Sequence, residues 1–495
     1  MTAQTTTQMT TQRRTGHWIE DWRPEDADFW EQGGRTVARR NLVWSIFAEH
    51  LGFSIWMIWS VSSALLASVG FDFSVQQLFF LVAIPSLVGA LLRLPYTFAV
   101  PMFGGRNWTI FSALALLVPT AGYALAVTNA GTPYWVFCVI AAFAGLGGGN
   151  FASSMTNINF FYPAAKKGTA LGLNAAGGNL GVSLVQFLLP IIVGGAGAFG
   201  LVHAAKGGIH LERAAYVYAG LCVVAAVGAY FFMDNLATAE SNPREQLAAL
   251  KSRHTWLMGL IYIGTFGSFM GYSSAMPLLI KLNFWAPDPA PLGTGIYFAY
   301  YAFLGAGVGS LARPLGGWLA DRFGGARITL GAIGAIIVFT LCVVWTLGRL
   351  SPNPDGEPAI AHDNAAWFPA FLCFFLLIFA ATGVGNGSAY KMIPAIFRRE
   401  AELASTPGTP GREEALRAAT RQSSAALGVV GAIGALGGFL IPITFSSPWV
   451  GDPLTATKTA LLAFVAYYVI CGLVCWSVYL RRRVVAAGEL VDVPV

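Results

Sequence analysis

Two arginines lie inside apolar stretches of the sequence. Arg93 belongs to "SLVGALLRLPYTF" (86–98), and Arg313 belongs to "GVGSLARPLGGWLAD" (307–321). At the centre of a bilayer an arginine costs about 3 kcal/mol or more, because the guanidinium loses its hydration. Each arginine therefore needs a partner at that depth, which can be a carboxylate, backbone carbonyl groups or an anionic ligand.

Acidic side chains are scarce where these arginines lie. Away from the ends of the predicted helices, the charged residues are three cations, Arg93, Arg313 and Lys391, and one acid, Glu49. This positive excess predicts an anion site, in which two guanidiniums hold a small oxyanion through forked hydrogen bonds. In the alternative interpretation, backbone carbonyl and side-chain amide groups hold the arginines without any ligand.

The composition indicates which elements position these residues. The chain has 495 residues, 55% of them hydrophobic and 11% charged, and its mean hydropathy is +0.60. Soluble proteins carry about 25% charged residues, so we expect an all-α membrane protein that crosses the bilayer many times. Twelve apolar stretches are long enough to cross a hydrocarbon core of about 30 Å. They are 42–69, 75–100, 108–127, 134–161, 168–195, 214–234, 255–281, 295–320, 327–347, 367–397, 420–446 and 456–480.

Basic residues are unevenly distributed over the connections between these stretches. Lys and Arg concentrate in the two tails and in the connections on the same side, while the opposite connections hold few. The positive-inside rule then places both termini in the cytoplasm and the chain in the cell (inner) membrane. The predicted division begins with a cytoplasmic tail (1–41), a six-helix bundle (42–234) and a central cytoplasmic loop (235–254). A second six-helix bundle (255–480), with its own cytoplasmic loop (398–419), and a final cytoplasmic tail (481–495) follow.

The two halves of the sequence repeat one another, which predicts pseudo-symmetric bundles. Arg93 and Arg313 are 220 positions apart, and "FGGRNWT" (103–109) and "FGGARIT" (323–329) share that offset. Each arginine lies eight residues, or about 12 Å along a helix, before the connection that follows it, and so near the midplane. Internal duplication of this kind is typical of secondary transporters, whose substrate sites lie at the repeat interface near the midplane.

Several motifs resemble those of known transporters. "GGWLADRFGGAR" (316–327) resembles the cytoplasmic-loop signature of the major facilitator superfamily, in which Asp321 and Arg322 would form a charged clamp between helices. Five further stretches resemble motifs of the NarK-type nitrate/nitrite porter family of that superfamily. Two of them, "GALLRLPY" and "LARPLGG", contain the two arginines, and the other three are rich in glycine or asparagine. They are "GGGNFASSMTNINFFYP" (147–163), "GTALGLNAAGGNL" (168–180) and "GVVGAIGALGGF" (428–439).

The resemblance implies a fold and a binding site. The fold would be the twelve-helix major facilitator fold, and Arg93 and Arg313 would coordinate the planar nitrate or nitrite anion. The other residues of the implied site supply aromatic walls, a hydroxyl group and an amide: Phe53, Phe151, Phe266, Tyr262 and Asn179.

Glu49 raises the question of how transport is driven. Our hypothesis is that Glu49, alone or paired with Lys391, takes up and releases a proton and so couples nitrate uptake to protons. The alternative is a permanent ion pair between Glu49 and Lys391. The predicted function is thus a secondary active transporter of nitrate, nitrite or both that works by alternating access, with nitrate/proton symport favoured. The other candidates are a nitrate/nitrite antiporter without proton coupling, a facilitator for another small anion or an organic drug, and a membrane nitrate sensor.

The sequence also predicts what the protein does not use. It contains no recognisable metal cluster, phosphate-binding loop or nucleophile constellation, so we expect no enzyme activity, cofactor or metal. The expected partners are nitrate and nitrite, protons under the symport hypothesis, and the lipid bilayer. We expect a monomer that binds no nucleic acid.

Overall fold

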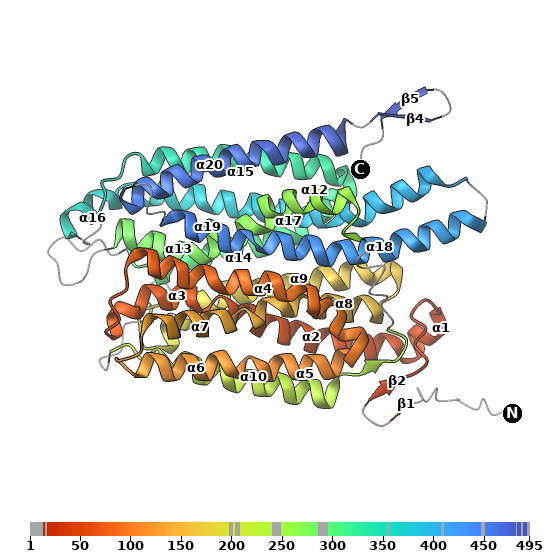
Figure 1. Ribbon diagram of the computed structural model, residues 1–495, viewed down its shortest axis with the longest axis horizontal. Coiled ribbons are helices and arrows are strands. Elements are labelled where there is room, and N and C mark those ends of the chain that lie inside the picture. Colours follow the sequence, from red (N-terminus) through yellow and green to blue (C-terminus); the bar gives the residue numbers. More distant parts are fainter. Residues whose placement is uncertain are drawn as a thin grey trace.

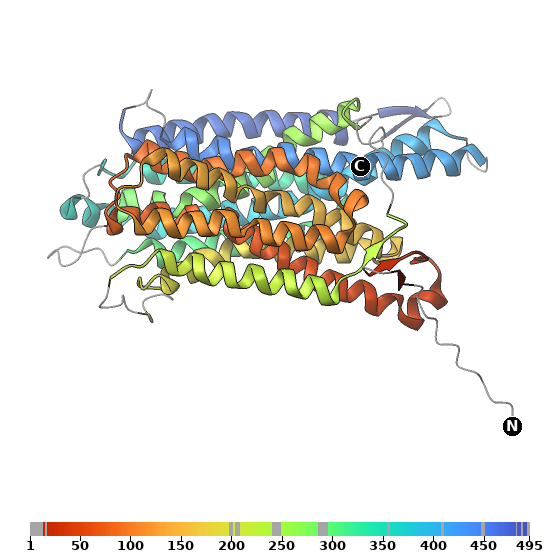
Figure 2. The ribbon, with the colours of Figure 1, turned by 60° about the horizontal axis from the view of Figure 1, so that its bottom comes forward.

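Twelve long helical stretches, formed by the described residues, run along the long axis of the molecule (Figure 1 and Figure 2). The computed structural model describes residues 13–14, 17–197, 201–202, 208–239, 249–285, 296–353, 357–406, 410–446, 451–481, 483–486 and 489–492. Several stretches are broken into two or more helices, at Met57 for example, where the backbone leaves the helical conformation.

The first six stretches form one half of the molecule, called the N-terminal bundle below. Their helices are α1 (Ala27–Phe29), η1 (Trp30–Gly34), α2 (Arg35–Trp56), α3 (Ile58–Leu65), η2 (Leu66–Val69), α4 (Val75–Phe103), α5 (Gly105–Ala115), α6 (Leu117–Thr128), α7 (Tyr134–Ala144), α8 (Leu146–Phe161), α9 (Ala164–Ile192) and α10 (Glu212–Phe232).

The last six stretches form the other half, the C-terminal bundle. Their helices are α12 (Arg253–Tyr262), η4 (Ile263–Gly267), α13 (Ser268–Phe284), α14 (Phe298–Phe323), α15 (Gly325–Leu347), α16 (Pro358–Ala365), α17 (Phe368–Ala404), α18 (Pro410–Ala435), α19 (Gly437–Phe445), α20 (Pro453–Val474) and η5 (Cys475–Leu480). The two bundles meet where α9 packs on α14, α3 on α13, and α4 on α18 and α19. Figure 1 shows the N-terminal bundle below and the C-terminal bundle above.

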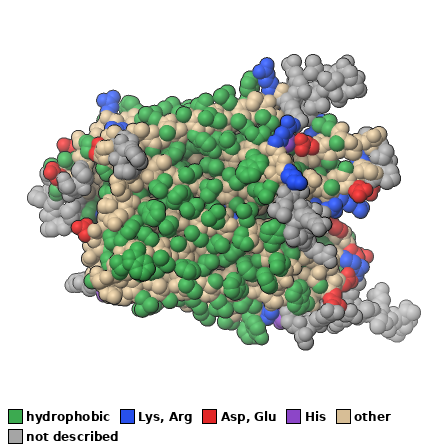
Figure 3. Space-filling view, viewed as in Figure 1, with side chains coloured by type: hydrophobic (Ala, Val, Ile, Leu, Met, Phe, Trp, Pro, Cys, Tyr) green, Lys and Arg blue, Asp and Glu red, His purple; other side chains and the backbone are tan. Residues whose placement is uncertain are grey.

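Within the described residues, ten helical stretches are long and apolar enough to cross a membrane by themselves. The other two, Arg253–Phe284 and Phe298–Phe323, are richer in glycine, serine and tyrosine. Neighbouring helices bury α13 along nearly its whole length, so Arg253–Phe284 needs little lipid-facing apolar surface. α14, in contrast, exposes Leu311, Leu315 and Trp318. Figure 3 shows hydrophobic side chains across the middle of one face and charged side chains at its two ends, the pattern of a membrane-embedded surface.

Short strands lie at one end of the molecule, called the terminal end below; the opposite end, where α16 lies, is the distal end (Figure 1). β2 (Trp18–Ile19) pairs antiparallel with β1 (Arg13–Arg14) and parallel with β3 (Asn235–Leu236), and β4 (Arg483–Ala486) pairs with β5 (Glu489–Asp492). Both predicted tails therefore contribute to the same end.

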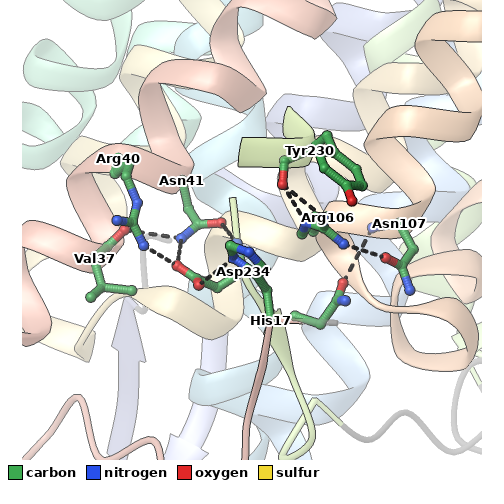
Figure 4. Close-up of polar contacts among 9 residues, drawn as sticks. His17, Val37, Arg40, Asn41, Arg106, Asn107, Tyr230 and Asp234 are labelled. Atoms are coloured by element: carbon green, nitrogen blue, oxygen red, sulfur yellow. Dashed lines mark hydrogen bonds and ion pairs between the residues drawn. The ribbon is translucent and has the colours of Figure 1, made fainter. Parts of the chain in front are cut away.

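A buried acid anchors this small sheet to the N-terminal bundle (Figure 4). Asp234, just before β3, is fully buried and accepts hydrogen bonds from Arg40 and Asn41 of α2. Its backbone N–H donates to Asn41 Oδ1 at 3.0 Å, and His17 lies 3.6 Å from its carboxylate. The chain before α2 is thus tied to the start of the central loop.

The helices extend beyond the predicted boundaries at the terminal end. α2 begins at Arg35 rather than at 42, and α17 runs to Ala404, so most of the predicted loop 398–419 is helical. Outside the membrane, charged pairs one turn apart such as Arg398 and Glu402, at 2.9 Å, support a helix without apolar sequence. Residues 240–248 and 407–409 of the predicted loops lie outside the described residues, and the functional bounds of the two bundles stay predictions.

Candidate functional site

Arg93 lies on α4 between the two bundles and is fully buried. Its Nε donates to the carbonyl of Gly148 on α8 at 3.2 Å, and its Nη1 donates to the carbonyl of Gly431 on α18 at 2.7 Å. Among the described residues, its Nη2 has no hydrogen-bond partner. The guanidinium carbon lies 4.6 Å from the ring centre of Phe151 and 5.0 Å from that of Phe266. Backbone carbonyls therefore hold this arginine, as the alternative interpretation expects, but they leave one of its nitrogens unsatisfied.

Arg313 lies on α14 of the opposite bundle and is 6% exposed. Its Nη2 is 3.5 Å from the hydroxyl of Tyr262, which donates to Oδ1 of Asn386 on α17 at 2.7 Å. Its Nη1 is a second buried guanidinium nitrogen without a partner among the described residues. The guanidinium carbon lies 5.7 Å from the ring centre of Phe151 and 5.6 Å from that of Tyr390.

Phe151 is the ring that the two arginines share. Phe266 stacks on it with 6.4 Å between ring centres, and Phe53 meets it edge-on at 6.1 Å. Tyr262 in turn stacks on Phe266 at 5.3 Å. The structure thus brings together both arginines, the three phenylalanines and the tyrosine that the resemblance implied.

Glycines of α18 and α19 allow close packing against α12 and η4, which carry Tyr262 and Phe266. A Cβ atom at Gly434 would overlap the Tyr262 ring, and one at Gly437 would overlap the backbone of Gly267 in η4. The α18–α19 stretch can therefore approach α12 and η4 at backbone distance. This close approach gives a physical role to the glycine-rich stretch 428–439.

Some residues of the site were not predicted. Trp56 lies 5.6 Å from the guanidinium carbon of Arg93, and Tyr390 and Asn386 surround Arg313. Helical spacing offered a signal, because Trp56 follows Phe53 by three positions and Tyr390 follows Asn386 by four. Asn179 is buried and its amide has no partner among the described residues, but it is not among the side chains that contact the two guanidiniums.

A cavity of about 320 Å³ leads from Arg93 toward the terminal end. Phe151 and Tyr390 line it beside Arg93, and Glu25, Lys167 and Arg421 line it nearer the chain termini. The remaining lining residues come mainly from α8, α9 and α18 and include Thr97, Met155, Thr156, Asn159, Ser424 and Gly428. An anion can therefore approach Arg93 from the terminal end.

Polar contacts join the two bundles at the distal end. Lys281 Nζ donates to the carbonyl of Ala64 at 2.6 Å. Gln186 Nε2 donates to the carbonyl of Ser273 at 2.6 Å, and Ser183 Oγ donates to that of Phe303 at 2.9 Å. The two bundles are thus held together on the side of Arg93 away from the cavity.

Glu49 lies on α2 and is fully buried. Its Oε2 accepts from Nδ2 of Asn174 on α9 at 2.5 Å. A Cβ atom at Gly178 would overlap its other oxygen, Oε1, so this glycine makes room for the carboxyl group. The charged groups of Arg93 and Arg313 interact electrostatically with the Glu49 carboxyl group.

Lys391 is placed differently from the prediction. Its side chain, 39% exposed, forms an ion pair with Asp321 of α14, so the predicted pairing with Glu49 is wrong. The reason is depth: Lys391 runs past Gly317, one turn before Asp321, toward the terminal end, whereas Glu49 is enclosed by α9. Asp321 does link two helices, although through Lys391. Arg322 lies over the ring of Trp318 on its own helix, at 4.9 Å.

The fold and the site between two bundles define a class of membrane transporter. Residues 50–442 match the Major Facilitator Superfamily, and the chain belongs to this superfamily. Solved structures agree on the fold: the D-xylose-proton symporter has a TM-score of 0.57 at 15% identity and covers 88% of this chain and 96% of its own. The nucleoside transporter NupG has a TM-score of 0.53 at 12% identity, over 88% of this chain and 98% of its own.

Within this superfamily the chain is similar to the NarU and NarK proteins. It is 38% identical over 479 residues to the nitrate/nitrite transporter NarU of Escherichia coli (strain K12), covering 95% of this chain and 98% of that protein. It is 39% identical over 399 residues to the probable nitrate/nitrite antiporter NarK2 of Thermus thermophilus, covering 77% of this chain and 83% of that protein. The predicted family and the twelve-helix fold are therefore confirmed. The prediction that this protein is a transporter and not an enzyme is confirmed by the same family membership.

Proposed function

We propose that this protein transports nitrate and nitrite across the membrane by alternating access, with the anion bound between Arg93 and Arg313. The observation that carries the proposal is the pair of buried guanidinium nitrogens, one from each bundle, that lack partners among the described residues beside the shared Phe151 ring. The names of the similar NarU and NarK2 proteins support the same substrates.

The chemistry of the site suits a small planar oxyanion. Nitrate presents oxygens in one plane, which can accept hydrogen bonds from Nη2 of Arg93 in one bundle and from Nη1 of Arg313 in the other. The faces of the anion can rest against aromatic rings, here Phe151 and Phe266. One bound anion would also reduce the repulsion between two buried cations, and this effect would favour approach of the bundles when substrate is present.

The arrangement of the bundles supports alternating access. The cavity reaches Arg93 from the terminal end, while Lys281, Gln186 and Ser183 join the bundles at the distal end. This is the geometry of a transporter open on one side. If both termini are cytoplasmic, as the distribution of Lys and Arg predicts, the structure represents the inward-open conformation.

We further propose that Glu49 couples nitrate transport to protons. The same two arginines interact with the Glu49 carboxylate and with the proposed anion site. A bound nitrate would compete with the carboxylate for this positive charge, so binding of nitrate and protonation of Glu49 would favour one another. The antiporter name of the Thermus relative favours a second candidate, nitrate/nitrite exchange without protons.

Uptake into proteoliposomes tests both levels of the proposal. The purified protein is reconstituted, and labelled nitrate uptake is measured with either a proton gradient or internal nitrite as the driving force. Symport predicts uptake with the proton gradient alone, and Glu49→Gln should abolish this dependence while nitrate counterflow continues. Uptake with internal nitrite alone would establish exchange instead. Failure to move either anion under both conditions would overturn the proposed substrates.

A further inference from the structure

A buried polar network connects Glu49 to the wall of the cavity. Asn174 Nδ2, which donates to Glu49, also lies 2.6 Å from Oγ of Ser154 on α8. Asn174 is fully buried, and Ser154 is 9% exposed. Met155, next to Ser154 on the helix, lines the cavity, and its sulfur is 3.5 Å from the same amide nitrogen. Asn174 and Ser154 thus lie between the carboxyl group and the route of the anion.

This network holds more acceptors than donors. Oδ1 of Asn174 is buried and has no hydrogen-bond partner among the described residues. Oε1 of Glu49 has no partner at normal hydrogen-bond geometry among these residues, although Ser154 is close enough to interact with the carboxyl group. Buried polar atoms are nearly always hydrogen-bonded, because an unmade bond costs the desolvation of the atom. A carboxylate can only accept hydrogen bonds, whereas a carboxylic acid also donates one. A proton on Glu49 would therefore turn the carboxyl group from an acceptor alone into a donor as well.

The amide of Asn174 can serve both states of Glu49. Facing the carboxyl group with Nδ2, it donates to a charged carboxylate; after rotation by half a turn, Oδ1 would accept from the O–H of a protonated Glu49. The distances of 2.5 Å to Glu49 and 2.6 Å to Ser154 suit O–H···O bonds, so Oδ1 could accept from both groups. Ser154 can follow the rotation because a hydroxyl both donates and accepts.

We propose that Asn174 is a positioning residue for proton coupling, whose side-chain amide rotates with the protonation of Glu49 and keeps the carboxyl group hydrogen-bonded in both states. This inference rests on the proposed role of Glu49 in coupling. The proton itself is exchanged with water, and Asn174 neither gains nor loses one. With Ser154 as the link to α8, the rotation also connects the charge of Glu49 to the helix that carries Phe151.

The surroundings of Glu49 leave this role to uncharged groups. The charged side chains that act on it are Arg93 from α4 and Arg313 from α14. The titratable neighbour on its own helix, His50, is directed away, with Nδ1 at 3.1 Å from the carbonyl of Gly177. The side chains of α8 and α9 that contact the carboxyl network are uncharged.

The test compares four variants in proteoliposomes: Asn174→Leu, Ser154→Ala, Glu49→Gln and the control Ser112→Ala. Ser112 is also a buried serine, but it bonds to its own helix α5 at Thr109 and lies outside the site. Each variant is assayed for proton-driven nitrate uptake as a function of pH, for protons moved per nitrate, and for nitrate counterflow, which requires no net proton movement.

We expect Asn174→Leu to lower proton-driven uptake by about 10-fold or more, the effect of one lost hydrogen bond to a charged group, and to flatten its pH profile. Counterflow should stay within about threefold of the wild type, because the arginines are untouched. Ser154→Ala should shift the pH profile in the same direction by less, and Ser112→Ala should not shift it.

Two outcomes separate the inference from its premise. If Glu49→Gln loses coupling while Asn174→Leu keeps the wild-type proton ratio and pH profile, the inference about Asn174 is wrong. If Glu49→Gln itself keeps normal coupling, the proposed role of Glu49 fails and the inference falls with it. Should Asn174→Leu not fold, an unshifted pH profile in Ser154→Ala overturns the rotating network.

Discussion

Replacing Arg93 with lysine separates the charge of this residue from its geometry. The ammonium group keeps the positive charge but offers its donors from a single point rather than from a planar fork. In the structure, Nε and Nη1 of Arg93 are used by the carbonyls of Gly148 and Gly431, which leaves Nη2 for the anion. A lysine that reaches one carbonyl would therefore lose the fixed direction of the remaining donor.

The expected loss of nitrate affinity follows from the one hydrogen bond to the anion that is lost. A hydrogen bond to a charged group contributes about 1.5–3 kcal/mol, and each 1.4 kcal/mol is a factor of about ten in affinity. Losing the bond from Nη2 to the anion should thus weaken nitrate binding about 10- to 150-fold. Contact with the faces of Phe151 and Phe266 should persist in part, because an ammonium also interacts with aromatic rings.

Isothermal titration of nitrate to the detergent-purified protein measures this change, and the KM of uptake gives a second value. Arg106→Lys is the matched control, because Arg106 is also buried and donates to a backbone carbonyl, that of Tyr230, at 2.9 and 2.7 Å. Arg106 lies near the terminal end of α5, away from the site, so its variant should bind nitrate normally. An Arg93→Lys protein that is folded and binds nitrate within about threefold of the wild type would refute a directed hydrogen bond from Nη2 of Arg93 to the anion.

Other substitutions test further parts of the structure. Gly178→Ala should destabilise the protein by about 1–3 kcal/mol, seen as a lower Tm in detergent, because its methyl group would overlap the buried carboxyl group of α2. Gly172→Ala on the same helix meets no atom within 4 Å and should leave Tm unchanged or higher; equal effects of the two would contradict the packing argument. Phe151→Leu should raise the KM for nitrate about 2- to 30-fold, because both guanidiniums lose the face of their shared ring. An unchanged KM would exclude this ring from the site. Lys281→Met removes a contact between the bundles at the distal end. A cysteine placed at Ser273 should then react about 10-fold faster with an impermeant maleimide added from that side. An unaltered reaction rate would show that this contact does not hold the bundles together.

The sequence predicted the architecture because membrane helices carry their own signal. A stretch of about twenty apolar residues satisfies its backbone hydrogen bonds internally, so each helix can be recognised without its neighbours. The least apolar stretches, Arg253–Phe284 and Phe298–Phe323, still form helices. Other helices enclose α13, while α14 keeps exposed apolar side chains such as Leu311 and Leu315. The ends were less predictable: α2 and α17 continue beyond the membrane, where charged pairs replace apolar sequence.

The sequence also predicted that the two arginines share a site, and the structure brings both to one aromatic ring. It could not predict the partner of Lys391, because the packing of α17 on α14 decides that Lys391 meets Asp321 rather than Glu49. Nor could it predict that Asn174 contacts Glu49, since residues 125 positions apart meet through the packing of α2 on α9.

The sequence by itself determined that charged groups within apolar helices require partners, because lipid offers them neither hydration nor hydrogen bonds. Only the tertiary structure decided which partners these are. Arg93 bonds to Gly431, 338 positions away and in the other bundle, because the packing of α18 on α4 brings this carbonyl within reach of the guanidinium. Local sequence fixes the energetic requirement, whereas the packing of helices distant in sequence fixes how it is met.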